Sequence, residues 1–334
     1  MKVWGRFFFS AILSVVLGLA AAGQEPAPAP DNSAQDGPAL APSETPAVNA
    51  GQPAAEATPH LDLTPDAEGK LSQQQMERLF RVVAGKDLEN DKRQRDYTYI
   101  ERDVQKKLDG KGNAKSTEIK TYEVMEIYGE QVQRLIAKDD KPLDAKEAAK
   151  EDEKIQKIID KRKNESEAER KKRLEKEEKE REDGRKFVTE VADAYSFTLA
   201  GSETVDGREA WVIDGEPRPG YEPHMKEAKF LPKFHGRVWI DKNDLQLSKM
   251  DVEALDTVSW GLFLARIHKG SRFTLEQTRV NDEVWLPRQL AVKVDVRLAL
   301  LKNFNLDFEQ DYRDYKKFRT SSKIVGMSEI SEQK

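Results

Sequence analysis

Residues Gly236–Met250 read GRVWIDKNDLQLSKM, and this stretch decides how the rest of the chain folds. Val238 and Ile240 alternate with polar or larger neighbours, which is the period of two of a half-buried strand. The polar residues 242–244 supply a turn in which Asn or Asp tolerates a left-handed backbone, and the return strand starts at Leu245. The stretch therefore predicts a β-hairpin.

Similar strand patterns recur on both sides of this hairpin. They are predicted at about residues 95–108, 116–128, 131–138, 195–200, 210–213, 260–267, 271–280, 284–298 and 303–313. Turn signals such as Asp109-Gly110, Asp206-Gly207 and Asn281-Asp282 separate them. Ten or eleven long strands with short connections predict a β-rich α+β fold. We expect one large curved antiparallel sheet, an incomplete β-barrel, with covering helices and one long charged helix.

Residues 71–84 predict a short amphipathic helix that covers part of the sheet. Its apolar residues recur at spacings of three and four. Ser72 is a candidate N-terminal cap, and Gly85 fits just past the end of the helix.

The segment Asp144–Asp183 is dominated by Glu, Lys and Arg, and predicts one long charged helix inserted into the sheet domain. Its few large apolar residues pin it to the body at the Ile155–Ile159 end, and Gly184 stops it. A helix that is polar all round is typically just solvated. The alternative is an arm on which envelope proteins dock.

The two ends of the chain have other compositions. Lys2 and Arg6 precede an apolar run that ends in small residues, which predicts a secretory signal at 1–23, cleaved after Ala22 or Gly23. The alternative is an uncleaved membrane anchor. Residues 24–69 are rich in Ala and Pro and predict a disordered linker, the folded domain spans 70–320, and 321–334 form a disordered tail. We therefore expect an exported, periplasmic protein, either free or held at the membrane.

The composition argues against catalysis. The chain has no cysteine, its net charge of -5 gives no case for nucleic acid, and neither a serine-nucleophile motif nor a glycine-rich phosphate loop is present. The four histidines, at 60, 224, 235 and 268, have no metal-ligand spacing. We expect no enzyme activity, no metal and no cofactor.

Two modest helices would not fill the concave face of so large a sheet, so an apolar cavity is predicted. The candidate lining residues are Phe197, Leu199, Trp211, Ile213, Val238, Ile240, Phe273, Leu275, Val294, Val296, Phe304 and Leu306. Tyr221, in the proline-rich loop 216–224, is the candidate lid. Trp239 is predicted on the opposite side of the sheet, which weakens it as a cavity residue.

Short motifs carry a resemblance to a known family. The segments Gly236–Asp241, Lys269–Val280 and Val284–Pro287 resemble the bacterial outer-membrane lipoprotein-sorting (LolA-like) family, over roughly Leu71–Lys317. The resemblance implies an incomplete β-barrel closed by helices, with an apolar cavity that holds acyl chains. It implies a non-enzymatic carrier whose partner is a lipid or an acylated lipoprotein.

The chain also departs from the family pattern. The Asp144–Asp183 helix is not part of the compact carrier, and the helix-borne arginine that latches the carrier's lid is not placed on this sequence. Relatives of the fold also act as envelope-stress sensors. An envelope interaction or stress-sensing module that docks partners on the charged helix is therefore the alternative function.

Overall fold

The computed structural model describes residues 61–109, 111–128, 130–260, 265–298 and 302–318. The predicted signal sequence, the linker up to residue 60 and the C-terminal tail lie outside them. The helices are α3 (Gln73–Gln94), α4 (Ala145–Lys163) and α5 (Glu167–Ala194), with the 3₁₀ turns η2 (Lys226–Ala228) and η3 (Leu231–Lys233). The strands are β1 (Lys70–Leu71), β2 (Tyr97–Leu108), β3 (Ala114–Ile127), β4 (Glu130–Lys138), β5 (Lys141–Pro142), β6 (Tyr195–Val205), β7 (Arg208–Pro217), β8 (Phe234–Asp241), β9 (Leu247–Ala254), β10 (Val258–Trp260), β11 (Ala265–Ile267), β12 (Arg272–Val280), β13 (Val284–Leu298) and β14 (Lys302–Lys317).

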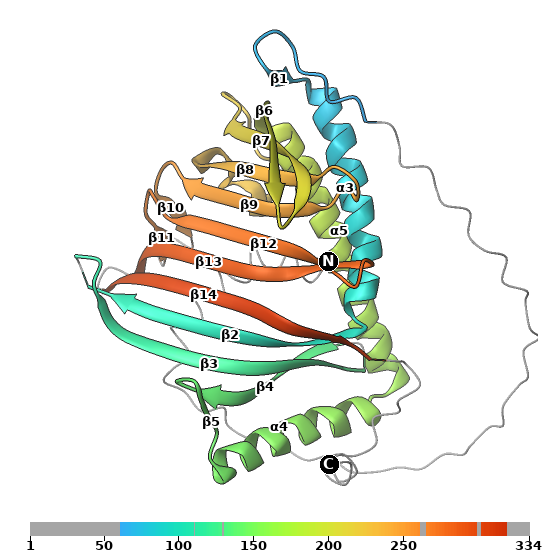
Figure 1. Ribbon diagram of the computed structural model, residues 1–334, viewed down its shortest axis with the longest axis vertical. Coiled ribbons are helices and arrows are strands. Elements are labelled where there is room, and N and C mark those ends of the chain that lie inside the picture. Colours follow the sequence, from blue (N-terminus) through green and yellow to red (C-terminus); the bar gives the residue numbers. More distant parts are fainter. Residues whose placement is uncertain (1–60, 110, 129, 261–264, 299–301, 319–334) are drawn as a thin grey trace, which may run out of the picture.

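All of these strands belong to one antiparallel sheet, shown in Figure 1. Its order is β1-β6-β7-β8-β9-β12-β13-β14-β2-β3-β4-β5, and β10 and β11 extend it beside β13. The last strand, β14, pairs with both β13 and β2. It therefore joins the N-terminal meander, β2–β4, to the C-terminal strands. Among the described strands the sheet ends at β1 and β5 and does not close. The predicted fold class, an incomplete barrel with covering helices, is confirmed.

The sheet has 14 strands, more than the ten or eleven predicted. The difference lies partly in β1 and β5, which are too brief to show an alternating pattern. The prediction of one strand at 260–267 is also wrong, because its described ends belong to two short strands, β10 and β11. The Asn281-Asp282 turn is confirmed, since both residues have the positive φ (51° and 56°) of a tight hairpin.

The hairpin β8–β9 is confirmed, but its turn is longer than predicted. The return strand starts at Leu247 rather than at Leu245, and Leu245 itself is the left-handed residue, with φ 54°. The carboxylate of Asp241 accepts hydrogen bonds from the backbone N–H groups of Asn243 (3.0 Å) and Asp244 (2.7 Å). These bonds fix the first residues of the turn. The return strand therefore starts two residues later than predicted.

Helix α3 starts at Gln73, directly after its predicted cap and two residues later than predicted, and it continues well past its predicted end. Ser72 caps it in a reciprocal capping box with Gln75. Gly85 lies inside the helix, not beyond it. The second half is held by polar contacts: the buried Asn90 and Gln94 side chains bond the backbone of Trp285 at 2.6–3.0 Å. Apolar periodicity does not register such contacts, which is why the sequence interpretation stopped too early.

The charged segment is two helices, not one. Residues 164–166 separate α4 from α5, and Ser166 opens α5 with a capping box to Glu169. Gly184 does not stop the helix, because α5 continues to Ala194, at the start of β6. The predicted attachment of the first helix is confirmed: Ile155 is buried against Ile127 and Val132.

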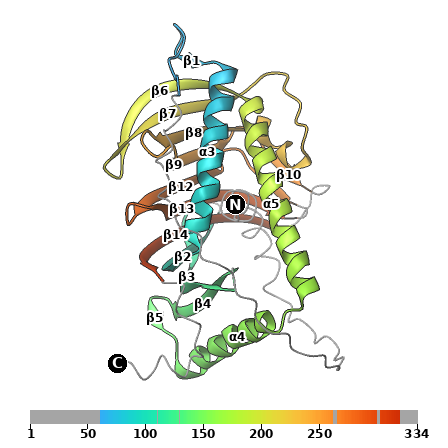
Figure 2. The ribbon, with the colours of Figure 1, turned by 90° about the vertical axis from the view of Figure 1, so that its right-hand side faces the viewer.

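The helices cover one face of the sheet. Figure 2 shows α3 and α5 running along it, with α4 beside the β3–β4 end. The predicted linker ends earlier than residue 69, since Leu63 is already buried in the core that α3 and α5 share with the sheet. Among the described helices, none has the length and apolar character needed to cross a membrane.

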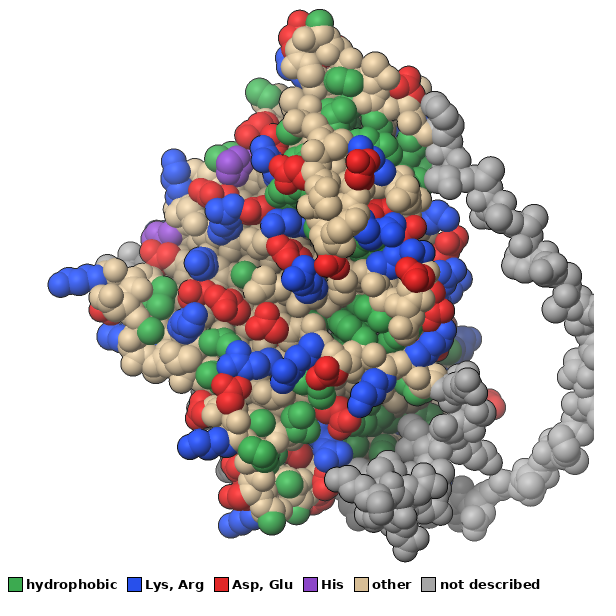
Figure 3. All heavy atoms as spheres, in the orientation of Figure 1, with side chains coloured by type: hydrophobic (Ala, Val, Ile, Leu, Met, Phe, Trp, Pro, Cys, Tyr) green, Lys and Arg blue, Asp and Glu red, His purple; other side chains and the backbone are tan. Residues whose placement is uncertain are grey.

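The opposite face is mostly polar. Acidic and basic side chains are interspersed over it, as Figure 3 shows, with no large field of one sign. Trp239 lies on this side in a small separate cluster with Ala210 and Val212, as predicted. Its indole N–H donates to Glu203 at 2.8 Å.

Candidate functional site

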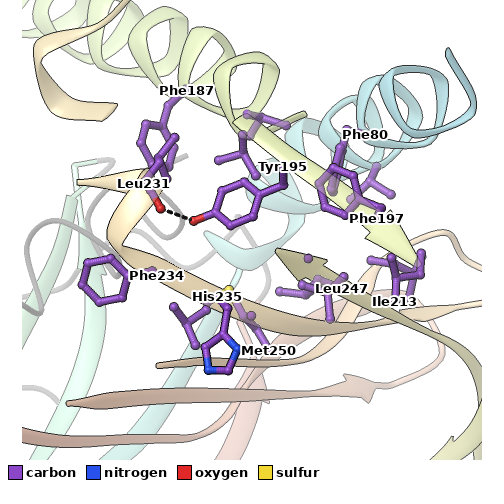
Figure 4. Close-up of a pocket in the computed structure, with 18 of the residues that line it drawn as sticks. Phe80, Phe187, Tyr195, Phe197, Ile213, Leu231, Phe234, His235, Leu247 and Met250 are labelled. Carbon is purple, nitrogen blue, oxygen red and sulfur yellow. Dashed lines mark hydrogen bonds between the residues drawn. The ribbon is translucent and has the colours of Figure 1, made fainter. Parts of the chain in front are cut away.

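The candidate site is an apolar cavity of about 120 Å³ between the two covering helices and strands β6–β9 (Figure 4). Phe80 of α3 and Phe187 of α5 face strand residues such as Ile213 and Leu247 across it, and Val83 of α3 also lines it. The remaining lining residues are Gly184, Val188, Val191, Tyr195, Phe197, Gly215, Phe230, Leu231, Phe234, His235, Gly236, Val238, Ile240, Met250 and Val252.

The cavity wall offers apolar contact and almost no polar chemistry. Its polar side chains are Tyr195 and His235, and both have protein partners. The Tyr195 hydroxyl donates to the Leu231 carbonyl at 2.7 Å (Figure 4), and burial raises the pKa of this tyrosine, so it stays neutral. His235 Nδ1 lies 3.3 Å from Glu216. The wall suits an apolar group and holds no nucleophile activated by a base.

Aromatic rings set the shape of the cavity. Phe80 and Phe197 meet edge to face with centroids 5.3 Å apart, and Phe187 lies 6.1 Å from Phe230. Phe197 fits because its neighbour across the strands, Gly215, has no side chain: a Cβ there would lie 3.2 Å from the ring. The floor of the cavity is therefore shaped by a glycine under an aromatic ring.

Alanine at two glycines is expected to act in opposite directions. Gly215→Ala crowds Phe197 and should lower the free energy of unfolding by about 1 kcal/mol. Gly85→Ala meets open space on the exposed side of α3 and should raise it by about 0.5–1 kcal/mol. Denaturant unfolding of both variants checks this. If both variants changed the free energy of unfolding in the same direction and by the same amount, the contact with Phe197 would have no effect on stability.

The predicted cavity residues separate into two groups. Phe197, Ile213, Val238 and Ile240 line the cavity. Others lie in or against the same apolar core but not in the cavity wall: Leu199, Trp211, Phe273, Leu275, Val294, Val296 and Leu306. The side chain of Phe304 is outside what the structure describes. Alternation tells which face of a strand is apolar, but not which part of that face the helices leave uncovered.

The part of the cavity wall formed by α5 and by the loop after β7 was not predicted from the sequence. Phe187, Val188 and Val191 follow Gly184, where the charged helix was expected to end. Their spacing on one helical face was the available signal. Phe230 and Leu231 lie at the start of the 3₁₀ turn η3, which is too short to give a periodic signal.

Tyr221, the candidate lid, does not line the cavity; it ties the loop to α5. Its hydroxyl donates to the buried carboxylate of Glu190 at 2.7 Å, and the backbone N–H of His224 donates to the same oxygen at 2.5 Å. Burial pushes the pKa of Glu190 up, but these hydrogen bonds outweigh it and the net pKa lies below its ordinary value. The same loop supplies Phe230 and Leu231 to the cavity, so Glu190 holds one cavity wall in place.

Glu190→Ala is expected to lower the free energy of unfolding by about 2 kcal/mol at pH 7, because a charged acceptor of several hydrogen bonds is lost. Since the folded-state pKa is lowered, this contribution is present above pH 4.5 and disappears as the pH falls through the folded-state value. Denaturant unfolding of wild type and variant at pH 7 and pH 3 measures this contribution to stability. Glu182→Ala, at an exposed site on the same helix, is the control and should change stability by less than about 0.5 kcal/mol.

The described residues contain no group of three or more His, Asp or Glu that could hold a metal ion. His224 lies by Glu190, His235 lies by Glu216, and His60 is outside the described range. Along α4 and α5, acids and bases pair at spacings of three or four, as in Glu153–Lys157 (2.7 Å) and Glu182–Lys186 (2.9 Å). This pattern favours solvated helices and marks no separate docking face.

Comparison with known proteins gives structural matches alone. No family model matches the chain, and no curated protein does. A domain described as an outer-membrane lipoprotein-sorting protein from Vibrio parahaemolyticus is 13% identical with a TM-score of 0.29, over 76% of this chain and 97% of that one. A LolA superfamily protein from Nitrosomonas europaea is 9% identical with a TM-score of 0.28, over 74% of this chain and 98% of that one.

Proposed function

We propose that this protein is a non-enzymatic binding protein or carrier that takes up the apolar part of a lipid or acylated molecule in the cavity between α3, α5 and β6–β9. The observation that carries the proposal is the wall of that cavity, which is apolar except for one hydroxyl and one imidazole that already have partners. No metal, cofactor or nucleic acid takes part.

Apolar burial alone supplies enough affinity for such a role. Each methylene removed from water contributes about 0.8 kcal/mol, so six buried carbons contribute about 5 kcal/mol before the cost of association. The cavity of about 120 Å³ is close in size to engineered apolar cavities that bind benzene. As folded, it accepts one slender apolar group, and a larger cargo requires that α3, α5 or the loop 216–233 move.

The proposed carrier is exported. Residues 1–23 are its secretory signal, and the chain from residue 24 to about 60 tethers or spaces the domain. The carrier domain includes the buried Leu63 and runs to about residue 320, and 321–334 are a tail. The place of action is the periplasm, where cargo of this kind has to be shielded from water.

The test is uptake of a fluorescent acyl probe by the delipidated full chain, together with mass spectrometry of lipid that copurifies from native envelopes. Val191→Trp places a large ring in the cavity from α5, and we expect it to weaken probe binding at least tenfold. Lys186→Trp adds the same ring at an exposed position of the same helix and should leave binding unchanged.

Unfolding curves establish that both variants fold. A wild-type protein that takes up no probe would overturn the proposal, and so would equal binding by the two tryptophan variants.

A further inference from the structure

We propose that the groove on the outer side of the α3–α5 seam binds the zwitterionic head group of a single-chain amphiphile whose tail enters the cavity. The inference rests on the proposed function and adds to it the class of ligand and the place of its polar end. The groove has a volume of about 480 Å³. It is lined by Glu77, Phe80, Arg81, Ala84 and Gly85 of α3 and by Val188, Thr189, Ala192 and Asp193 of α5.

The first step is that the groove adjoins the apolar cavity. Phe80 and Val188 line both spaces, so a wall of two side chains separates them. Phe80 is half-buried and rests edge to face on Phe197. The proposal requires that the Phe80 ring rotate to open a path between the groove and the cavity. A ligand can then have one end in each.

The second step is that the two spaces differ in chemistry as the two ends of an amphiphile do. The cavity wall is apolar, whereas the groove carries the charged side chains of Glu77, Arg81 and Asp193 and the hydroxyl of Thr189. Arg81 and Thr189 are exposed. Within the described part of the chain, neither Glu77 nor Arg81 has an ion-pair partner, so both are available to a ligand.

The third step is the sign of the charges. The groove lining contains one guanidinium and two carboxylates, so it has a net charge of about -1 at neutral pH. A purely anionic head group would be attracted by Arg81 and repelled by the acids. A head group with an inner phosphate and an outer ammonium offers an opposite charge to each of the three side chains. The phosphate lies on Arg81 and the ammonium lies near Glu77 and Asp193.

The fourth step is the size of the tail space. A cavity of about 120 Å³ holds roughly what an apolar cavity of about 150 Å³ holds, one benzene-sized group. Two acyl chains side by side do not fit, whereas the end of one chain does. A lysophospholipid with an ethanolamine head is the simplest molecule that has both a zwitterionic head group and a single acyl chain.

Competition against a bound fluorescent acyl probe tests the proposal with the full chain. The competitors share one chain length: lysophosphatidylethanolamine, lysophosphatidylglycerol and the uncharged monoacylglycerol. We expect the zwitterionic lipid to bind at least tenfold more tightly than either of the others. Arg81→Gln should reduce that preference about tenfold and leave the affinity for the monoacylglycerol unchanged. Arg78→Gln, an exposed arginine of α3 outside the groove, is the control and should change neither.

Two results overturn the proposal while the apolar cavity stands: equal affinity for the three head groups, or the same preference in Arg81→Gln as in wild type. Tighter binding of the anionic lipid overturns the charge assignment and the proposal with it. If the fluorescent probe itself does not bind, the proposed function fails, so the two failures are distinguishable.

Discussion

Asp241→Ala is expected to lower the free energy of unfolding by about 3–5 kcal/mol, the largest effect of any single change proposed for this chain. The carboxylate is fully buried and receives both arms of the Arg208 guanidinium, at 2.7 and 2.9 Å. It also accepts the two backbone N–H groups that set the β8–β9 turn. Alanine removes all four bonds and leaves Arg208 paired with Asp244, at 3.1 Å.

A second Arg–Asp pair on neighbouring strands provides a matched control. Arg237 and Asp214 also bond through two arms, at 2.5 and 2.8 Å, but both side chains are at least one-third exposed. Asp214→Ala should therefore change stability by less than about 1 kcal/mol. Denaturant unfolding at pH 7 measures both variants. Comparable losses in the two would show that burial of Asp241 is not the cause.

The sequence around Asp241 predicts local features of the hairpin but not the contacts that Asp241 makes with other strands. The alternation around Val238 and Ile240 predicted the hairpin and the direction in which Trp239 points, and both are confirmed. Alternation reports which residues share a face, and that information is local. The role of Asp241 is not local, because Arg208 comes from another strand.

The same limit explains the errors in the helices. The second half of α3 is fixed by bonds from Asn90 and Gln94 to Trp285, and α5 is fixed by Phe187 and Val191 on the sheet. Each contact joins residues far apart in the chain, so propensity alone ended both helices too early. The cavity was expected on the apolar face, but its position depends on where α3 and α5 lie, which no single segment encodes.

Strand β2 carries an acidic pair, the buried Glu101 and the half-buried Asp103. Glu101 on β2 is 4% exposed, and its carboxylate accepts hydrogen bonds from Gln133 (2.6 Å) and Gln310 (3.3 Å). Burial, together with the nearby Asp103, raises the pKa of Glu101 to about 8, and burial also raises the pKa of Asp103. Tyr99 and Tyr312 beside them have pKa values above their ordinary range and stay neutral.

Glu101→Gln is therefore expected to remove most of a pH dependence of stability. In wild type the folded state keeps a proton on Glu101 that the unfolded chain releases near pH 4.5, so this stability is complete below pH 4.5 and is lost as the pH rises through about 8. The loss is several kcal/mol, since the folded-state pKa of about 8 lies well above 4.5 and each pKa unit corresponds to about 1.4 kcal/mol. Glutamine resembles the protonated acid and cannot ionise, so the variant should match wild type at pH 4 and exceed it at pH 9. Denaturant unfolding at both pH values measures this, with the exposed Glu209→Gln as control; parallel profiles for wild type and Glu101→Gln would refute the assignment.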